Sequence, residues 1–241
     1  MKQFASPRLL ALLALAICAL DIVPTGSAAA QSQTSGPSTQ VKPAEIQIPN
    51  GPLPIRILLQ SPADTVTDLQ VICLFQSNPS NTLHGSLTEI NDKLKGLLDQ
   101  VRKPDLFRGE SGETILITPP AGTLGAGKLL VIGLGDSETF TPQRMELVGS
   151  ILYREAERLA VSQPFFAPTI LDGGVTTFGT GQVSEQVVSG FLRAARMDRV
   201  LRNTGAWQGQ PIQALTFLAG PTHAAETQQG IEKAIAADAA R

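Results

Sequence analysis

The sequence predicts an α/β domain built around a mixed central β-sheet. Short apolar runs rich in β-branched residues alternate with segments whose apolar residues recur at helical spacing. The run at 129–134 is apolar throughout, as expected for a strand buried on both faces. The predicted order of elements is β-β-α-β-β-α-β-α-β-α, so a single domain over 53–241 accounts for this part of the chain.

The strands are predicted first, because turn-forming residues bound each apolar run. They are expected at 54–59, 69–75, 114–118, 129–134, 165–171 and 212–218.

Four helices are predicted from their caps and apolar stripes. Ser86 and Glu89 form a capping box, which opens a helix that ends before Pro104. Thr141 is the expected N-cap of the second helix, with proline at the first helical position. Ser184 is the expected cap of the third helix, and the fourth spans 224–240.

The first thirty residues are predicted to be a signal peptide. Lys2 and Arg8 precede an apolar run at 9–20, and small residues at 28–30 suit cleavage after Ala30. A membrane anchor is the alternative, but the run has about 12 residues where about 20 are needed. Cys18 raises the question of a lipoprotein, which the bulky Ile17 before it disfavours. We therefore expect export to the periplasm or the medium, with no membrane span after cleavage.

Residues 31–52 are rich in Ser, Thr, Gln and Pro and are predicted to be a flexible tether. Cleavage would leave Cys73 as a lone thiol within an apolar run, where it is expected to pack as a small buried hydrophobe.

Composition excludes several classes of function. The formal net charge is −2, from 19 basic and 21 acidic residues, and no basic cluster indicates a nucleic-acid partner. Two cysteines and two histidines cannot build a disulfide framework or a zinc ribbon. We interpret His84 and His223 as solvated side chains, since neither has a potential ligand at metal-binding spacing. No catalytic motif is present, and no metal or cofactor is expected.

Two glycine-rich turns resemble phosphate-binding loops only in part. The segment 122–128 begins like a P-loop, but Leu129 follows where Ser or Thr would hold magnesium, so a hairpin-like turn is favoured. The segment 133–136 lacks the third glycine of a dinucleotide fingerprint.

The loop at 172–181 is the better candidate for a ligand site, because it joins a predicted strand to a predicted helix. Its backbone donors can cradle an anion at the carboxyl end of the sheet. The alternatives are a connection without a ligand and, for the aspartates, turn capping. The candidate ligand-binding residues are Asp136, Asp172, Gly173, Gly174, Gly179, Thr180 and Gly181.

Two further features have structural interpretations. Asp198, with arginines at 196, 199 and 202, predicts an ion-paired helix end, although three arginines can also contact an acidic partner. Trp207 lies in a polar loop and is either a packing cap or an interface anchor.

Two segments resemble the N-terminal domain of the leucine aminopeptidase (cytosol aminopeptidase) family. One is KLLVIGLGDSETFTPQRMELVGSILYREAERLA at 128–160; the other is VSEQVVSGFLRAARMDRVLRN at 183–203. In the second, Met197 replaces the family's usual aromatic residue, while Asp198 and Arg199 remain. The strands near 69–75 and 212–218 fall in family order, so the resemblance covers about 55–235.

The resemblance implies a three-layer, macrodomain-like fold with helices on both faces of the sheet. In the family a C-terminal catalytic domain binds two metal ions, and no position of this chain matches its ligands. We therefore expect a non-catalytic exported module that binds a protein partner or a small anionic ligand. The alternatives are an accessory or truncated part of a metal-dependent leucyl aminopeptidase, and a nucleotide or ADP-ribose site at 172–181. Because the family's domain packs within an oligomer, the resemblance is also compatible with a homo-oligomer.

Overall fold

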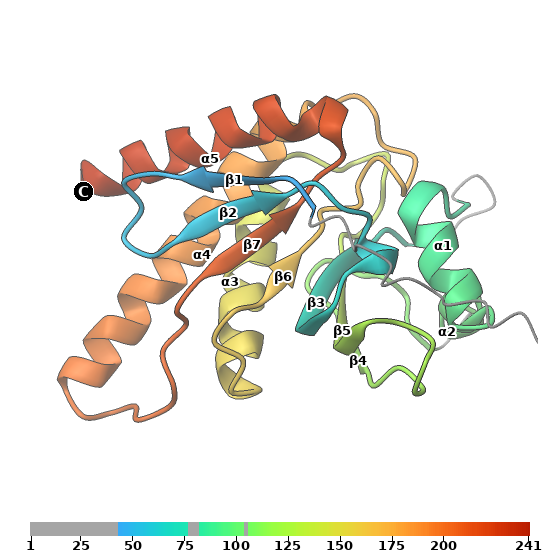
Figure 1. Cartoon of the computed structure of the whole chain (residues 1–241), viewed down its shortest axis with the longest axis horizontal. Coiled ribbons are helices and arrows are strands. Elements are labelled where there is room, and N and C mark those ends of the chain that lie inside the picture. The colour runs from blue at the N-terminus through green and yellow to red at the C-terminus, as the bar shows by residue number, and fades with distance from the viewer. Residues whose placement is uncertain (1–42, 77–81, 104–105) are drawn as a thin grey trace, which may run out of the picture. The chain divides into compact units, whose positions relative to one another are not determined.

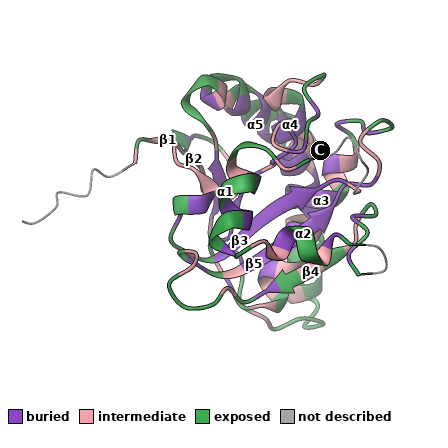
Figure 2. Ribbon diagram, turned by 90° about the vertical axis from the view of Figure 1, so that its right-hand side faces the viewer, coloured by how far each residue is buried: buried purple, intermediate pink, exposed green. Residues whose placement is uncertain are grey.

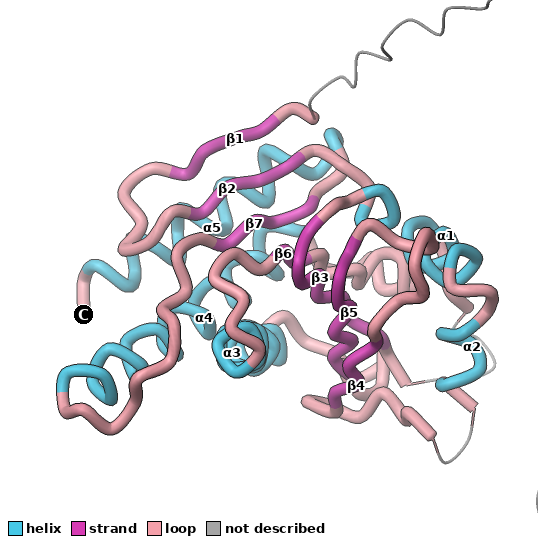
Figure 3. Tube along the Cα trace, turned by 60° about the horizontal axis from the view of Figure 1, so that its bottom comes forward, coloured by secondary structure: helices cyan, strands magenta, loops and turns pink. Residues whose placement is uncertain are grey.

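A computed structural model describes residues 43–76, 82–103 and 106–241, so the predicted signal peptide and Pro104 lie outside the described residues. Its sheet has seven strands in the order β1-β2-β7-β6-β3-β5-β4 (Figure 3). The five central strands pair in parallel, while β1 and β4 run antiparallel at the two edges. The expected mixed α/β sheet is confirmed. Its strands are β1 (Glu45–Ile48), β2 (Ile55–Leu58), β3 (Thr67–Leu74), β4 (Thr114–Ile117), β5 (Ala126–Gly133), β6 (Phe165–Phe166) and β7 (Leu215–Leu218).

Helices cover both faces of the sheet, which confirms the three layers (Figure 1). Val71 and Cys73 of β3 face the core under the longer helices, and Ile72 and Leu74 face the core under the shorter pair. This alternation explains why the second half of the strand, residues 71–74, is apolar throughout and buried, as Figure 2 shows for β3. The longer helices are α3 (Arg144–Arg158), α4 (Thr180–Asn203) and α5 (Ala224–Ala239); the shorter are α1 (Gly85–Lys93) and α2 (Leu97–Val101).

The three longer helices cross closely because glycines lie at their contacts. A side chain at Gly190 of α4 would overlap the Glu146 carbonyl of α3, and one at Gly149 would overlap the Val187 carbonyl. The hydroxyl of Ser150 donates to the Gly190 carbonyl oxygen at 3.1 Å. These contacts bring the helix backbones together, so the layer has little freedom to shift.

The structure corrects the predicted tether at 31–52 in its described part, 43–52, while 31–42 lie outside the described residues. Residues Glu45–Ile48 of that range form β1, which pairs with β2 from Glu45 opposite Leu58 to Ile48 opposite Ile55. The composition of the whole segment is polar, but its last part alternates polar and apolar residues, and Ile48 is buried.

The first helix is also corrected. The chain turns through left-handed conformations at Lys95 and Gly96, so the predicted helix is divided into α1 and α2. The side chain of Asn91 bridges the break, donating to the Asp99 carboxylate at 2.8 Å. The apolar stripe predicted for the first helix is nevertheless placed as expected, since Leu87 and Ile90 of α1 are fully buried.

The predicted strand at 165–171 is wrong beyond Phe166. Pro168 has no N–H for the ladder, and Thr169 has a φ of 51° that turns the chain out of the sheet. The Thr169 hydroxyl then replaces the lost pairing, accepting from the Cys73 N–H at 2.9 Å and donating to the Cys73 carbonyl at 2.7 Å. Cys73 is buried as predicted, and this burial raises the pKa of its thiol.

Two predicted caps are wrong. The helix α4 begins at Thr180, and Ser184 lies inside it, where its hydroxyl donates to the carbonyl oxygens of Gly181 and Thr227 at 3.1 and 3.0 Å. The helix α3 begins at Arg144, preceded by a turn in which the Thr141 carbonyl accepts from the Arg144 N–H. The turn predicted within 122–128 is confirmed, since it joins antiparallel β4 and β5.

Candidate functional site

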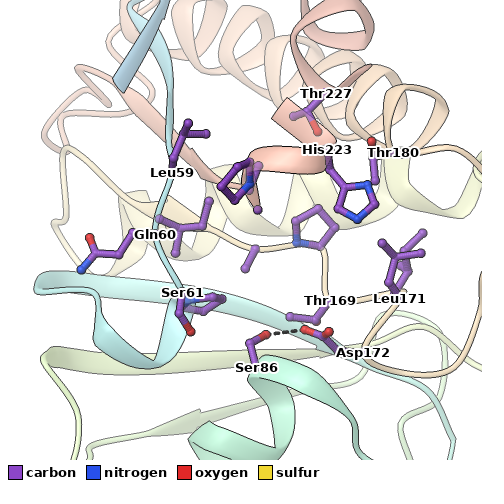
Figure 4. Close-up of a pocket in the computed structure, with 18 of the residues that line it drawn as sticks. Leu59, Gln60, Ser61, Ser86, Thr169, Leu171, Asp172, Thr180, His223 and Thr227 are labelled. Atoms are coloured by element: carbon purple, nitrogen blue, oxygen red, sulfur yellow. Dashed lines mark hydrogen bonds between the residues drawn. The ribbon is translucent and has the colours of Figure 1, made fainter. Parts of the chain in front are cut away.

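A pocket of about 520 Å³ opens where the parallel strands β2, β6 and β7 end (Figure 4). Its walls are the segments that follow these strands, together with the first turns of α1, α4 and α5. The volume lies within the range of small-molecule sites, and the carboxyl ends of parallel strands are where α/β folds bind ligands. Its apolar lining consists of Leu59, Pro62, Ala167, Pro168, Ile170, Leu171, Val183, Leu218, Ala219 and Pro221.

Asp172 is the principal charged group at the pocket. Its carboxylate accepts a hydrogen bond from the Ser86 hydroxyl, and its backbone carbonyl accepts from the His84 N–H at 2.9 Å. Gly85, with a φ of 48°, lies directly against the carboxylate, and a side chain there would overlap it. Burial raises the pKa of this carboxyl, while the hydrogen bonds from Ser86 act in the opposite direction. Asp172 thus caps α1 from a distant part of the chain.

The capping box predicted for α1 is therefore wrong. Ser86 lies within the helix, and His84 occupies the N-cap position. Glu89 accepts a hydrogen bond from the Ser61 hydroxyl at 2.8 Å instead of turning back to its own helix. Both residues line the pocket, so the residues read as a local cap belong to the candidate site.

A second carboxylate holds the start of α4. The Thr180 hydroxyl donates to the Glu226 carboxylate of α5 at 3.1 Å. Gly179 and Gly181 lie against the same residue, and a side chain at either would overlap it. The N-terminal turns of α1 and α4 thus each carry a carboxylate from elsewhere in the chain.

Two of the seven predicted ligand-binding residues, Asp172 and Thr180, line the pocket. Gly173 packs against the Phe75 ring, and Gly174 adopts a φ of 88° in the turn. The Asp136 carboxylate accepts from the Glu138 N–H at 3.0 Å, a turn-capping role, and Asp136 is not among the residues around the pocket.

Sequence reasoning missed His223 and the segments that follow β2 and β7. His223 lies half-buried on the pocket wall, whereas His84 is exposed as expected. Figure 4 places His223 and Thr180 on one side, facing Ser86 and Asp172 on the other. The carboxyl ends of parallel strands meet at one edge of a sheet, so a known strand order predicts that these segments lie at the pocket.

The predicted ion-paired end of α4 is confirmed in part. Asp198 accepts from Arg202 Nε at 2.6 Å and from the Tyr153 hydroxyl at 2.9 Å. Trp207 donates from Nε1 to the Glu157 carboxylate at 2.6 Å.

Among the described residues no group of three or more His, Cys, Asp or Glu side chains could hold a metal ion. Within the same ranges, no helix is both long and apolar enough to cross a bilayer.

The fold is that of a macrodomain-type α/β module. The structure superposes on an Oceanobacillus iheyensis macrodomain with ADP at a TM-score of 0.51 and 14% identity, covering 80% of this chain and 98% of that one. It superposes on a tomato leucine aminopeptidase mutant at a TM-score of 0.56 and 19% identity, covering 83% of this chain and 38% of that one. At these identities the similarity establishes the fold alone.

The chain belongs to the cytosol aminopeptidase family through its N-terminal domain, whose family model matches residues 71–198. A probable cytosol aminopeptidase of Alkaliphilus oremlandii is 23% identical over 164 residues. That alignment covers 68% of this chain and 32% of the relative, so the chain spans about a third of that relative's length. The resemblance predicted from 128–160 and 183–203 is thereby confirmed.

Proposed function

We propose that this chain is an exported, non-catalytic binding module whose ligand occupies the pocket at the ends of β2, β6 and β7. The pocket is the observation that carries the proposal, because its volume and largely apolar walls suit a small molecule. Its polar groups also support binding, since Ser86 orients Asp172 and Ser61 orients Glu89 by hydrogen bonds. Such fixed polar groups orient the ligand in a binding site and make the site specific for it.

Filling the pocket tests this proposal. A library of small fragments is titrated into the ¹⁵N-labelled full chain, and amide shifts are mapped onto the structure. We expect hits to perturb Thr169, Asp172 and Thr180, and Ala219→Phe, which projects a ring from the pocket wall, to abolish them. Ala121→Phe is the matched control, since Ala121 is exposed in a turn. Hits that map elsewhere, or that survive Ala219→Phe, would contradict the pocket as the site.

The absence of catalysis is tested separately. The full chain is incubated with leucyl-p-nitroanilide and added manganese or zinc, and no hydrolysis above the metal-only control is expected. Turnover that co-purifies with the chain and follows its concentration would refute the non-catalytic proposal.

Export is proposed from the basic residues Lys2 and Arg8, the apolar run at 9–20 and the small residues at 28–30. Fractionation of the native host followed by N-terminal mass spectrometry tests it. We expect a chain that begins at Gln31, outside the cytoplasm. A chain that retains Met1 in the cytosolic fraction would rule export out.

A second candidate function is an accessory role to a leucyl aminopeptidase of the same cell. Apolar side chains at the end of α4 favour it: Met197 and Val200 are 57% and 58% exposed and follow each other at helical spacing. Cross-linking in the native host tests this role, with Met197→Lys as the variant and Val66→Lys, another exposed apolar site, as the control. Recovery of an aminopeptidase catalytic domain, lost with Met197→Lys only, is expected; its absence would count against the role.

A further inference from the structure

The loop that we expected to cradle an anion already uses several of its backbone N–H groups in its own hydrogen bonds. The N–H of Gly173 donates to the Thr169 carbonyl at 3.0 Å, that of Gly174 to Leu171 at 3.0 Å, and that of Val175 to Ile170 at 3.1 Å. These donors close a tight turn within the loop itself. An anion cradle needs backbone N–H groups that point outward unpaired, so the first half of the loop does not form one.

Carboxylates already lie at two of the three helix N-termini at the pocket, those of α1 and α4. A helix N-terminus attracts anions through its free N–H groups and its dipole. Asp172 takes this place on α1, and Glu226 takes it on α4 through Thr180. A phosphate group would have to displace these carboxylates or lie beside them, and like charges in a partly buried site repel strongly.

The charged side chains around the pocket are acidic. Asp172 and Glu89 line it, and none of the described lining residues is lysine or arginine. His223 is the one basic side chain among those described residues. Phosphate sites are usually built with arginine or lysine, whereas this set of groups favours a positive charge.

The Asp172 carboxylate also has hydrogen-bond acceptor positions that a ligand can use. An ionised carboxylate has about four acceptor positions, and Ser86 uses those on the α1 side. Burial disfavours the charge of this carboxyl and raises its pKa, so a cation that reached it would supply missing stabilisation. Leu59, Ile170 and Leu218 then offer apolar surface to the remainder of a ligand.

We infer that the pocket binds a small molecule with a protonated amine head and an apolar body, the ammonium group pairing with Asp172. This inference rests on the proposed function of the pocket and names the chemistry of its ligand. It replaces the small anion expected from the loop at 172–181 with a cation.

Three probes that share one apolar body test the inference: 3-phenylpropylamine, 3-phenylpropan-1-ol and 3-phenylpropanoate, with ADP and ADP-ribose alongside. Each is titrated into the full chain while amide shifts are recorded. We expect the amine to bind at the pocket about tenfold more tightly than the alcohol, in line with a charge-assisted hydrogen bond. The carboxylate and the nucleotides should bind more weakly than the alcohol.

Asp172→Asn should remove the preference, so that the amine and the alcohol bind this variant with similar affinity. Asp68→Asn is the matched control, because Asp68 is an exposed carboxylate on β3 outside the pocket, and it should keep the tenfold preference. The comparison of head groups in the unsubstituted chain holds even if the variant fails to fold.

The outcomes separate the two proposals. Equal binding of amine and alcohol at the pocket, or tighter binding of the carboxylate or the nucleotides, would overturn the cationic ligand and leave the pocket standing as a site. Silence of all probes, with the fragment hits also mapping elsewhere, would overturn both.

Discussion

Replacing Thr169 by valine should destabilise the fold and loosen the pocket, because this side chain ties the pocket loop to β3. Its hydroxyl makes two hydrogen bonds with the backbone of Cys73, at 2.9 and 2.7 Å, and both residues are buried. Valine keeps the shape but leaves the Cys73 N–H and carbonyl unpaired. Valine and threonine are both β-branched, so the backbone φ of 51° at position 169 is equally strained in the two proteins.

Each unpaired buried group costs about 1–3 kcal/mol. The two groups belong to one residue and share one partner, so their costs do not simply add, and we expect about 3 kcal/mol in total. For a domain of this size, 1 kcal/mol lowers the melting temperature by about 2–4 °C, which gives a fall of about 6–12 °C.

Thermal unfolding followed by circular dichroism measures this fall, with Thr169→Ser as the control. Serine retains the hydroxyl and loses one methyl group, so its cost should be about 1 kcal/mol. Hydrogen exchange should also rise at 167–175 in the valine variant but not in the serine variant. If valine melts within about 2 °C of serine, the two hydrogen bonds do not hold the loop and the reasoning fails.

Three further predictions concern other parts of the molecule. Gly190→Ala should lower the unfolding free energy by about 1–3 kcal/mol in denaturant titrations, because the new methyl group overlaps the Glu146 carbonyl; unchanged stability would mean that α3 and α4 separate freely. Tyr153→Phe should cost about 1–3 kcal/mol by leaving Asp198 with one donor fewer, and an unchanged denaturation midpoint would refute this. Asp172→Asn should raise the melting temperature at pH 7. Burial raises the folded-state pKa of Asp172, so its contribution to stability is present at low pH and is lost as pH rises through that pKa. The gain should therefore vanish toward about pH 4, and a gain that does not depend on pH would contradict the electrostatic cause.

Much of the fold could be predicted because burial leaves a periodic trace in the sequence. The alternation in β3 and the stripe of Leu87 and Ile90 in α1 reflect the cores that they enter. The failures lie where a distant residue replaces a local one. Nothing near α1 in the sequence reveals that Asp172 caps it, so the pattern of Ser86 and Glu89 predicts a local capping box. The end of β6 is likewise determined by the bond between Thr169 and Cys73.

The candidate site could be predicted only along one segment of the chain. The sequence indicates Asp172 and Thr180 because they lie between an apolar run and the helix predicted to begin at Ser184. His223 lies on the same pocket because β7 inserts between β2 and β6, an arrangement that the order of elements in the sequence does not reveal. A strand order supplies this information, and with it the segments after β2 and β7 become visible.

The parallel pairing of β2 with β7 also affects the order of events during synthesis. Ile55 lies opposite Leu215, so β2 cannot pair with β7 until the roughly 160 residues that separate them have been made. At typical translation rates this delay is on the order of 10–30 s, during which the emerging chain cannot close its sheet. Such non-local pairing also slows folding after release. If the chain is exported as we propose, this topology helps to keep its sheet open for transport until β7 has been made.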